Sequence, residues 1–202
     1  MAPSSRRAKR RRQLLEAARD VFAEKGYVAA TVDDIVGRVE VARGTFYLYF
    51  DDKLDVFGAL VSDFFARLAG GIQSIALDAE APSPRTQLRA NLARLVATAR
   101  RDPAMVKLAL STATGVDPGL DAKLEAFYAS LRQFMDETLE TGQAIGLVRE
   151  GARGPMLSLA LGALQQLLLD AVSGALEQDE EALVDEIMRF LESGLLAAAS
   201  AR

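Results

Sequence analysis

The segment 43–50, Arg-Gly-Thr-Phe-Tyr-Leu-Tyr-Phe, carries the side chains of this sequence that are best suited to recognise another molecule. Phe46 and Phe50 are one turn apart, which predicts a short helix from about residue 42 or 43 to residue 50 with both rings buried. The outward side chains then supply a guanidinium, a hydroxyl and two phenols. Groups of this kind bind phosphate oxygens and base edges, and Gly44 would let a backbone approach closely. The pattern therefore indicates recognition of a polyanion, although Tyr47 and Tyr49 as core aromatics remain an alternative.

The distribution of charge agrees with a polyanionic partner at the N-terminal end. The chain has 202 residues and a formal net charge of −4. Residues 1–53 contain 11 Lys/Arg against 8 Asp/Glu, whereas residues 54–202 contain 13 against 20. Six basic residues between Arg6 and Arg12 come before the first acid. Such a run attracts phosphates, but taken alone it could equally be a solvated tail that aids solubility.

The composition argues against catalysis. The chain has no cysteine and no histidine, which removes disulfides, thiolate metal sites and the histidine-based nucleophile arrangements. No Gly-rich phosphate loop is present, and the acidic pairs at 33–34 and 51–52 fall where helices should begin, as the helix dipole favours. There is no secretory signal and no uninterrupted apolar stretch of about 18 residues. We therefore expect no enzyme activity, cofactor, metal or membrane anchor, and a soluble cytoplasmic protein.

The apolar periodicity predicts an all-α fold of about nine helices with no strands. A first helix should run from Arg10 to Lys25, with Gly26 as a left-handed cap. Thr31 should cap a short second helix that ends near Val39, with Asp34 completing a capping box. The recognition segment follows a tight turn at Glu40-Val41. The later helices are expected at about 54–77, 84–101, 103–114, 120–144, 156–176 and 180–199, with Gly70-Gly71 as either a joint or the end of the fourth helix.

Two short helices separated by a tight turn, with basic residues before them, have the sequence form of a helix-turn-helix. Short helices do not fold alone, so they must pack on their neighbours through Ile35, Val36, Val39, Val41 and the two phenylalanines. The stretches 21–27 (Val-Phe-Ala-Glu-Lys-Gly-Tyr), 31–35 (Thr-Val-Asp-Asp-Ile) and 43–50, with Lys53 after them, resemble the TetR family of repressors. The resemblance covers about residues 10–57.

The resemblance implies a DNA-binding domain at residues 1–53 and a helical ligand-binding and dimerisation domain at residues 54–202. By motif position, it implies that the DNA contacts are Thr31, Arg43, Gly44, Thr45, Tyr47, Tyr49 and Lys53. Two residues depart from the family pattern. Glu40 stands where glycine is usual and would hold a left-handed conformation at a cost of about 1 kcal/mol. Ala42 stands where Ser or Thr commonly caps the recognition helix, which costs about 1 kcal/mol as well.

The C-terminal two-thirds contains residues that could line a ligand cavity or pack as ordinary core. For the cavity we expect Phe65, Leu68, Val96, Met105, Leu108, Phe127, Leu131, Phe134 and Gln165. Gln165 lies in an otherwise apolar helix and needs a partner, so it faces either the cavity or a dimer seam. The last two helices are apolar almost all round, which predicts burial on both sides within a two-fold dimer, with burial inside one chain as the alternative. The expected interface residues are Leu164, Leu168, Ala171, Val172, Ile187, Phe190, Leu191 and Leu195.

Together these features predict a homodimer that binds double-stranded DNA. The family resemblance implies that it is a ligand-responsive regulator and that the DNA is a palindromic operator. The family resemblance adds a repressor that a small, mostly apolar effector releases. Two alternatives stay open. One is an architectural DNA-binding protein without an effector, and the other is a helical small-molecule-binding module.

Overall fold

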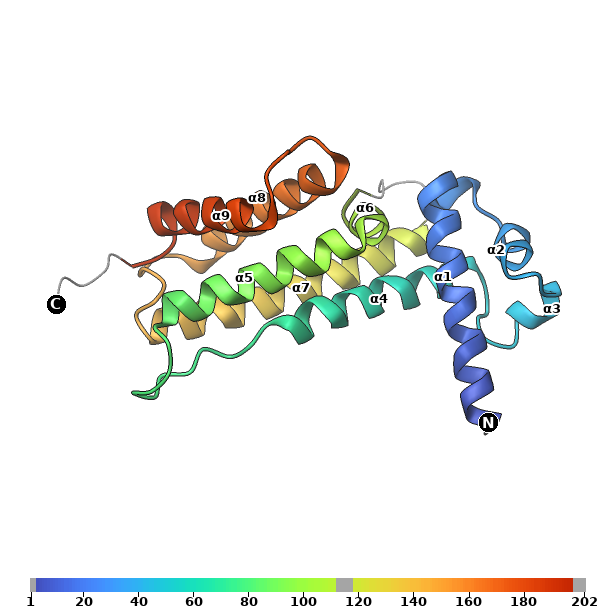
Figure 1. Ribbon diagram of the computed structural model, residues 1–202, viewed down its shortest axis with the longest axis horizontal. Coiled ribbons are helices and arrows are strands. Elements are labelled where there is room, and N and C mark those ends of the chain that lie inside the picture. The colour runs from blue at the N-terminus through green and yellow to red at the C-terminus, as the bar shows by residue number, and fades with distance from the viewer. Residues whose placement is uncertain (1–2, 112–117, 198–202) are drawn as a thin grey trace. The chain divides into compact units, whose positions relative to one another are not determined.

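The structure is a computed structural model that describes residues 3–111 and 118–197. Within these ranges the chain forms nine α-helices, which confirms the predicted all-α class (Figure 1). One isolated antiparallel bridge joins Val148 to Leu196. The helices are α1 (Pro3–Ala29), α2 (Val32–Val39), α3 (Arg43–Phe46), α4 (Lys53–Gly71), α5 (Pro84–Arg101), α6 (Pro103–Ser111), α7 (Pro118–Ala144), α8 (Arg153–Ser173) and α9 (Glu180–Gly194).

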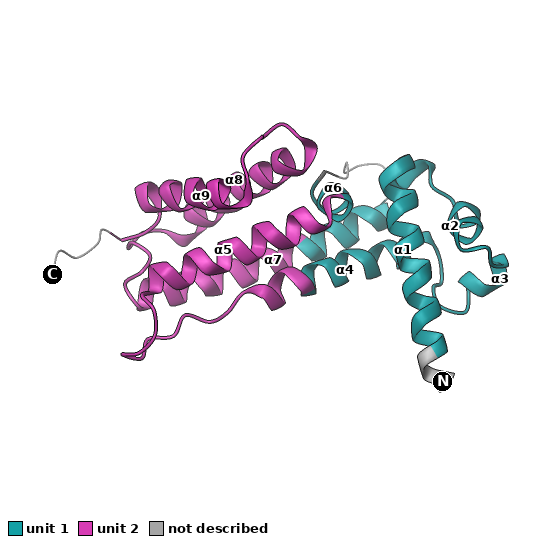
Figure 2. Cartoon of the chain, viewed as in Figure 1, with its two compact units in different colours: residues 1–66, 104–127 teal, residues 67–103, 128–202 magenta. Residues whose placement is uncertain are grey.

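Packing divides the chain into two compact units, shown in different colours in Figure 2. Unit 1 contains residues 1–66 and 104–127, and unit 2 contains residues 67–103 and 128–202. Unit 1 thus groups α1–α3 with most of α4, α6 and the first part of α7. The division at residue 53 that the sequence predicts concerns function, and it stays a prediction.

The core of unit 1 consists of aromatic and branched side chains from α1 to α4. Phe22, Phe46 and Phe57 are each 2% exposed or less. The Phe22 and Phe57 rings both contact Tyr27, with centroids 5.5 and 5.1 Å from its ring. Burial of side chains of this size contributes about 1.5–3 kcal/mol each. The short helices α2 and α3 are therefore held by the core that they share with α1 and α4 rather than by helix propensity.

Helix α1 begins at Pro3, seven residues before the predicted start, because the Arg-, Lys- and Ala-rich segment is made of good helix formers. The sequence predicted that the helix stops at Gly26, and the backbone of Gly26 does leave helical geometry. Gly26 has φ 75° and ψ 158°, outside helical geometry, although one further turn continues to Ala29. Positive φ is a conformation that glycine adopts without steric cost.

Unit 2 is built around α5, which packs against α9 and α8. Val96 on α5 is fully buried against Leu183, Val184 and Ile187 of α9. A second cluster joins the end of α7 to α8 and α9 through Leu139, Val148, Met156, Leu157, Met188 and Leu196.

Several helix ends differ from the expected positions. Helix α4 ends at Gly71, not near Leu77, because two glycines weaken its last turn and other groups bond the backbone that follows. Helix α8 runs from Arg153 to Ser173, about three residues earlier than expected, and Gly174 caps it at φ 84°. Helix α9 ends at Gly194, because the next residues pair with residues 147–149 instead. The break expected at Gly115–Asp117 lies outside the described residues.

Candidate nucleic-acid interface and ligand cavity

The capping box predicted for α2 is present. The Thr31 hydroxyl accepts from the Asp34 backbone N–H at 3.1 Å, and an Asp34 carboxylate oxygen accepts from the Thr31 backbone N–H at 3.0 Å. The Lys25 ammonium lies 2.6 Å from the other Asp34 oxygen. Hydrogen bonds from Lys25, then from the Thr31 side chain and backbone, lower the pKa of Asp34 to about 2. Thr31 thus orients α2, and its expected DNA contact stays a prediction.

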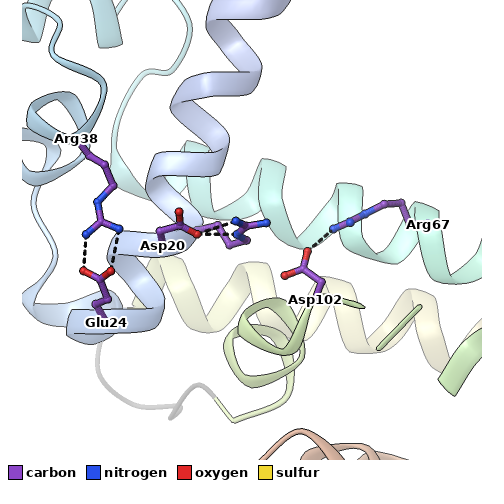
Figure 3. Close-up of polar contacts among 6 residues, drawn as sticks. Asp20, Glu24, Arg38, Arg67 and Asp102 are labelled. Atoms are coloured by element: carbon purple, nitrogen blue, oxygen red, sulfur yellow. Dashed lines mark hydrogen bonds and ion pairs between the residues drawn. The ribbon is translucent and has the colours of Figure 1, made fainter. Parts of the chain in front are cut away.

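A bidentate ion pair fixes α2 against α1. The Arg38 guanidinium donates to both carboxylate oxygens of Glu24, at 2.8 and 2.5 Å (Figure 3). The hydrogen bond from Arg38 is the main cause that lowers the pKa of Glu24. Two-pronged geometry restricts both side chains, so this pair orients the helices more strictly than a single contact would.

The turn between α2 and α3 carries the two departures that the sequence shows. Glu40 has φ 54° and ψ 48°, so it holds the left-handed conformation expected of a residue in place of glycine. Ala42 precedes α3 without any side-chain cap. Helix α3 ends at Phe46, short of the predicted end at Phe50. Residues 47–49 continue as a turn in which the Tyr49 N–H bonds to the Phe46 carbonyl at 2.9 Å.

The outer face of α3 and its following turn is polar and aromatic. Phe46 and Phe50 are buried as predicted, while Tyr47 and Leu48 are 47% and 68% exposed. The exposed Arg43 guanidinium lies 3.0 Å from Asp33 and 3.4 Å from the Tyr47 hydroxyl. Gly44 is exposed, and a Cβ added there would meet nothing within 4 Å. A partner molecule can therefore contact an arginine and a phenol on this face, and it can approach the backbone at Gly44 without obstruction.

The basic N-terminal part of α1 lies against the same region. The Arg11 guanidinium is 5.1 Å from the centre of the Phe50 ring, and that of Arg7 is 6.0 Å from the Tyr49 ring. Thr45 and Tyr49, which the sequence also marks as contacts, are half-buried. Guanidinium groups at this distance from aromatic faces gain cation–π attraction.

Lys53 has a structural role that the sequence did not reveal. Its ammonium donates to the carbonyls of Tyr27, Val28 and Ala30 at 2.7, 3.3 and 3.0 Å, and it lies 4.4 Å from the Tyr27 ring centre. These are carbonyls at the C-terminal end of α1, where a cation is favoured by the helix dipole. The ammonium therefore joins the start of α4 to the end of α1. Its expected phosphate contact stays a prediction.

Unit 2 contains an apolar cavity of about 620 Å³. Its walls come from the segment after α4, from α5, α7, α8 and α9, and from the connection at 145–148. The charged side chains that line it are Glu137 and Glu186, both exposed, and no lysine or arginine is among the lining residues. A volume within about 300–1,000 Å³ with mostly apolar walls is typical of small-molecule sites.

The residues expected to bind ligand are distributed over both units. Phe134 lines the cavity. Val96 belongs to the solid core beside it, and Leu68 and Leu131 are half-buried in unit 2 outside the lining. The remaining apolar ones lie in unit 1, where the Phe65 and Phe127 rings pack edge-to-face at 4.4 Å and Met105 and Leu108 are buried. As ligand contacts these residues remain predictions.

Gln165 has a partner inside unit 2. It hydrogen-bonds the Tyr128 hydroxyl, and burial is the main cause that raises the pKa of that phenol. Its neighbour Gln166 donates to Asp170 at 2.9 Å. The polar pair of α8 is thus directed at side chains of its own chain.

The sequence predicted the α5 side of the cavity only in part, since it marked Val96 but not Leu88 or Leu95. Leu88, Leu92 and Leu95 all line it, and their i, i+4, i+7 spacing was a usable signal for one helix face. Ile72 and Ile75 were not recognisable, because the sequence placed them inside a helix that ends before them.

The residues expected at the dimer seam differ in exposure. Leu168 and Ile187 are 6% and 7% exposed and belong to the chain's own core, whereas Phe190 is 53% exposed. The others are half-buried: Leu164, Ala171, Val172, Leu191 and Leu195. Only 17% of the residues in the most apolar window of α8 are buried within the chain.

A buried acid connects α4 with the end of α5. Asp102 is 6% exposed and lies 3.1 Å from the Arg67 guanidinium (Figure 3). Buried carboxylates require such a partner, since an unpaired charge is costly in the interior. The pair joins the last residues of α4 to the end of α5 within unit 2.

Two short helices around a tight turn, with an exposed arginine on the second and an exposed phenol directly after it, have the form of the helix-turn-helix class. Residues 14–60 match the sequence profile of the family described as bacterial regulatory proteins, tetR family. The helices α1–α3 and the start of α4 are therefore similar to that family, and the match is confined to residues 14–60.

Curated bacterial regulators are similar to this chain in sequence over about a third of its length. The chain is 37% identical over 75 residues to the HTH-type transcriptional repressor DhaR from Mycobacterium sp. (strain GP1), which is 37% of this chain and 38% of that protein. The chain matches DhaR and two further curated relatives, YdgC and FasR, over only 31–38% of their own length.

Solved structures agree over nearly the whole fold. The fatty acid degradation regulator FadR from Bacillus halodurans is 24% identical, with a TM-score of 0.73 over 91% of this chain and 98% of that one. FadR from Bacillus subtilis, solved in complex with stearoyl-CoA, is 24% identical with a TM-score of 0.70 over 90% of this chain and 97% of that one. At this identity the likeness establishes the fold of the C-terminal helices.

Proposed function

We propose that this protein is a homodimeric transcriptional regulator that binds a palindromic operator and leaves it when an apolar effector occupies the cavity of unit 2. The observation that carries the proposal is the exposed face of α3, where Arg43 and Tyr47 project beside a basic α1. In a dimer, two such helices enter successive major grooves about 34–36 Å apart. The proposal assigns the protein no catalytic activity and places it in the cytoplasm, where the DNA is.

Selection of bound duplexes from a random pool tests the DNA part of the proposal. We expect a palindromic consensus, on which Arg43→Ala should lose about 1–3 kcal/mol of binding free energy and relax the preference at one base pair. Arg43→Lys is the matched control, because it keeps the charge but not the two-pronged geometry. Binding without any sequence preference at moderate salt would favour the architectural alternative instead.

The effector that fits best is a molecule with a long acyl chain. The cavity has apolar walls, and the FadR structure from Bacillus subtilis contains stearoyl-CoA. Because no basic side chain lines the cavity, the acyl chain would lie inside and any phosphate-bearing head group outside the lining.

Operator titrations with a graded effector series test this assignment. Acyl-CoAs and free fatty acids of increasing chain length should lower operator affinity until the chain exceeds the cavity, and short-chain members should have no effect. Coupling of this kind is typically about 5–150-fold in affinity. An equal effect of CoA without an acyl chain would contradict the cavity as the site.

The exposed apolar surface of α8 and α9 supports a dimer. Among the described residues, α8 is the helix that is long and apolar enough to cross a membrane by length and composition, yet few of its residues are buried in the chain. Leu159 on α8 and Phe190 on α9 are 70% and 53% exposed. Apolar residues concentrated in this way mark an interaction surface. A second copy of the chain is the partner that the two-fold arrangement of an operator requires.

A further inference from the structure

Residues 72–77, here called the strap, form an extended connection directly after α4. Ile72, Gln73, Ser74 and Ile75 line the cavity, and the segment is not helical. The strap is therefore both a wall of the cavity and the continuation of α4.

The strap is held by two amide side chains of α5 that are one turn apart. Asn91 accepts from the Gln73 N–H at 2.9 Å and donates to the Gln73 carbonyl at 2.8 Å. Gln87 does the same to Ala76, with both distances 2.8 Å, and also donates to the Pro82 carbonyl at 2.6 Å. Each amide thus satisfies both backbone groups of one strap residue, as a neighbouring strand would.

Arg94 extends this network to a third residue of α5. Its guanidinium donates to the Asn91 side-chain oxygen at 2.8 Å and to the Gln73 side-chain oxygen at 2.9 Å. Asn91 is only 8% exposed, so its bonds are made away from bulk water. The N-terminal end of the strap is consequently held more firmly than the Gln87 end.

The other non-helical wall of the cavity is fixed differently. At 147–149 the backbone bonds to other backbone: the Arg149 N–H to the Leu195 carbonyl at 3.0 Å, and the Ala197 N–H to the Leu147 carbonyl at 2.9 Å. Within the described chain, no backbone–backbone hydrogen bond between elements involves residues 73–77. The remaining walls are helices with their own internal bonds. Residues 73–77 are thus the part of the wall whose backbone hydrogen bonds come from side chains rather than from other backbone.

We propose that the strap is the gate of the effector cavity and that Gln87 and Asn91 are its latch. An apolar ligand enters when both amides release the backbone, and it then holds the gate closed because Ile72 and Ile75 become buried against it. This inference rests on the proposed effector site and adds its access route and two positioning residues.

Hydrogen exchange of the Gln73 and Ala76 amides measures the gate directly, because each N–H bonds to a latch residue. The probe is N-phenyl-1-naphthylamine, a neutral fluorophore whose emission rises in apolar surroundings. Nuclear Overhauser contacts to Leu92 and Leu139 methyl groups first establish that it occupies the cavity. If the strap opens only when the cavity is empty, the probe slows exchange of these two amides by a factor of one plus the ratio of free probe concentration to Kd. At a free probe concentration of fifty times Kd this factor is about fifty.

Gln87→Ala is the main variant, since Gln87 is half-buried and its loss should leave the fold intact. It should speed Ala76 exchange in the free protein and speed both association and dissociation of the probe, each by about fivefold or more. Gln87→Glu keeps the acceptor for the Ala76 N–H, so its exchange and probe rates should lie between those of the wild type and of Gln87→Ala. Gln166→Ala, an amide bonded within α8, should change neither rate and is the matched control.

The outcomes separate the gate from the proposed function. Probe bound in the cavity with unchanged exchange at Gln73 and Ala76 would overturn the gate and leave the effector site standing. Faster exchange in Gln87→Ala with unaltered probe kinetics would reduce Gln87 to a structural role and also overturn it. Absence of probe from the cavity would remove both the site and its gate. Loss of operator specificity with these kinetics intact would contradict the regulator alone.

Discussion

Lys53 shows how one side chain in a motif can serve the fold. Its three carbonyl partners lie in the last turn of α1 and just after it. Lys53→Met keeps the chain's bulk but removes the charge, and should lower the free energy of unfolding by about 1.5–3 kcal/mol, as expected for hydrogen bonds from a charged donor. Urea denaturation measures this.

A second measurement on the same variant separates the two roles of Lys53. If the ammonium also contacts a phosphate, the salt dependence of operator binding should fall by about one unit of slope. Unchanged stability in Lys53→Met, together with a reduced slope, would mean that the carbonyl contacts contribute nothing.

Asp34 should make stability depend on pH in the acid range. Its pKa is about 2 in the folded protein and 3.8 without its partners, so the unfolded chain binds the proton more readily. The stabilisation is complete above pH 4 and is lost as the pH falls toward 2. Thermal melts between pH 2 and 7 should show the wild type above Asp34→Asn near neutral pH. A constant difference down to pH 2 would contradict this account.

Glu40 combines a strained backbone with an acid next to the proposed DNA surface. Glu40→Gly removes a left-handed conformation that costs about 1–2 kcal/mol for an L-residue, against about 0.5–1 kcal/mol of added unfolded-state entropy. We expect a small gain in stability and tighter operator binding. Glu40→Gln is the control that keeps the strain but removes the charge, so it should tighten operator binding without changing the stability. A less stable Glu40→Gly protein would show that the acid makes a stabilising interaction.

At the scale of elements, the sequence was most informative where local chemistry decides. The Thr31–Asp34 capping box and the glycine at position 26 follow from side chains within a few positions, and both are present. The ends of α4 and α9 were missed, because the competing partners are remote. Gln87 and Asn91 bond the strap from 11 to 18 residues away, and Leu147 pairs with residue 197.

Two helical glycines provide matched tests of packing around unit 2. A Cβ at Gly70 meets nothing within 4 Å, whereas one at Gly142 would lie 2.6 Å from a methyl carbon of Val148. Gly70→Ala should therefore raise the free energy of unfolding by about 1 kcal/mol through helix propensity. Gly142→Ala should lower it by about 1–3 kcal/mol, since the branched Val148 has little freedom to move. Chemical denaturation of both variants checks the opposite signs; equal effects would mean that the chain adapts at 142.

At the scale of the molecule, dimerisation is the property that most needs a direct test. Leu159→Glu and Phe190→Glu each place a carboxylate on an exposed position, so the single chain should tolerate them. In a two-fold seam each charge would be buried near its own copy, at a cost of several kcal/mol. Light scattering should give twice the chain mass of 21.7 kDa for the wild type and the single mass for the variants.

Leu77→Glu changes a side chain that is 63% exposed outside α8 and α9, and it should remain dimeric. A wild-type mass equal to one chain would rule out the dimer and leave α8 without its proposed cover. The sequence predicts an interface on the last two helices, but it does not separate core from surface residues within them. Leu168 and Ile187 are buried whereas Phe190 is exposed, and this depends on where α5 packs against α8 and α9, which no local pattern encodes.

The pairing of residues 147–149 with 195–197 sets a practical boundary for protein engineering. Leu147, Val148, Leu195 and Leu196 also line the cavity, so this pairing closes one of its ends. Trimming the chain back to Gly194 would strip the acceptor from the Arg149 N–H and the donor from the Leu147 carbonyl. Tags and fusion partners therefore belong after Ala197, and a sensor that is to release its ligand easily could be made by weakening this closure.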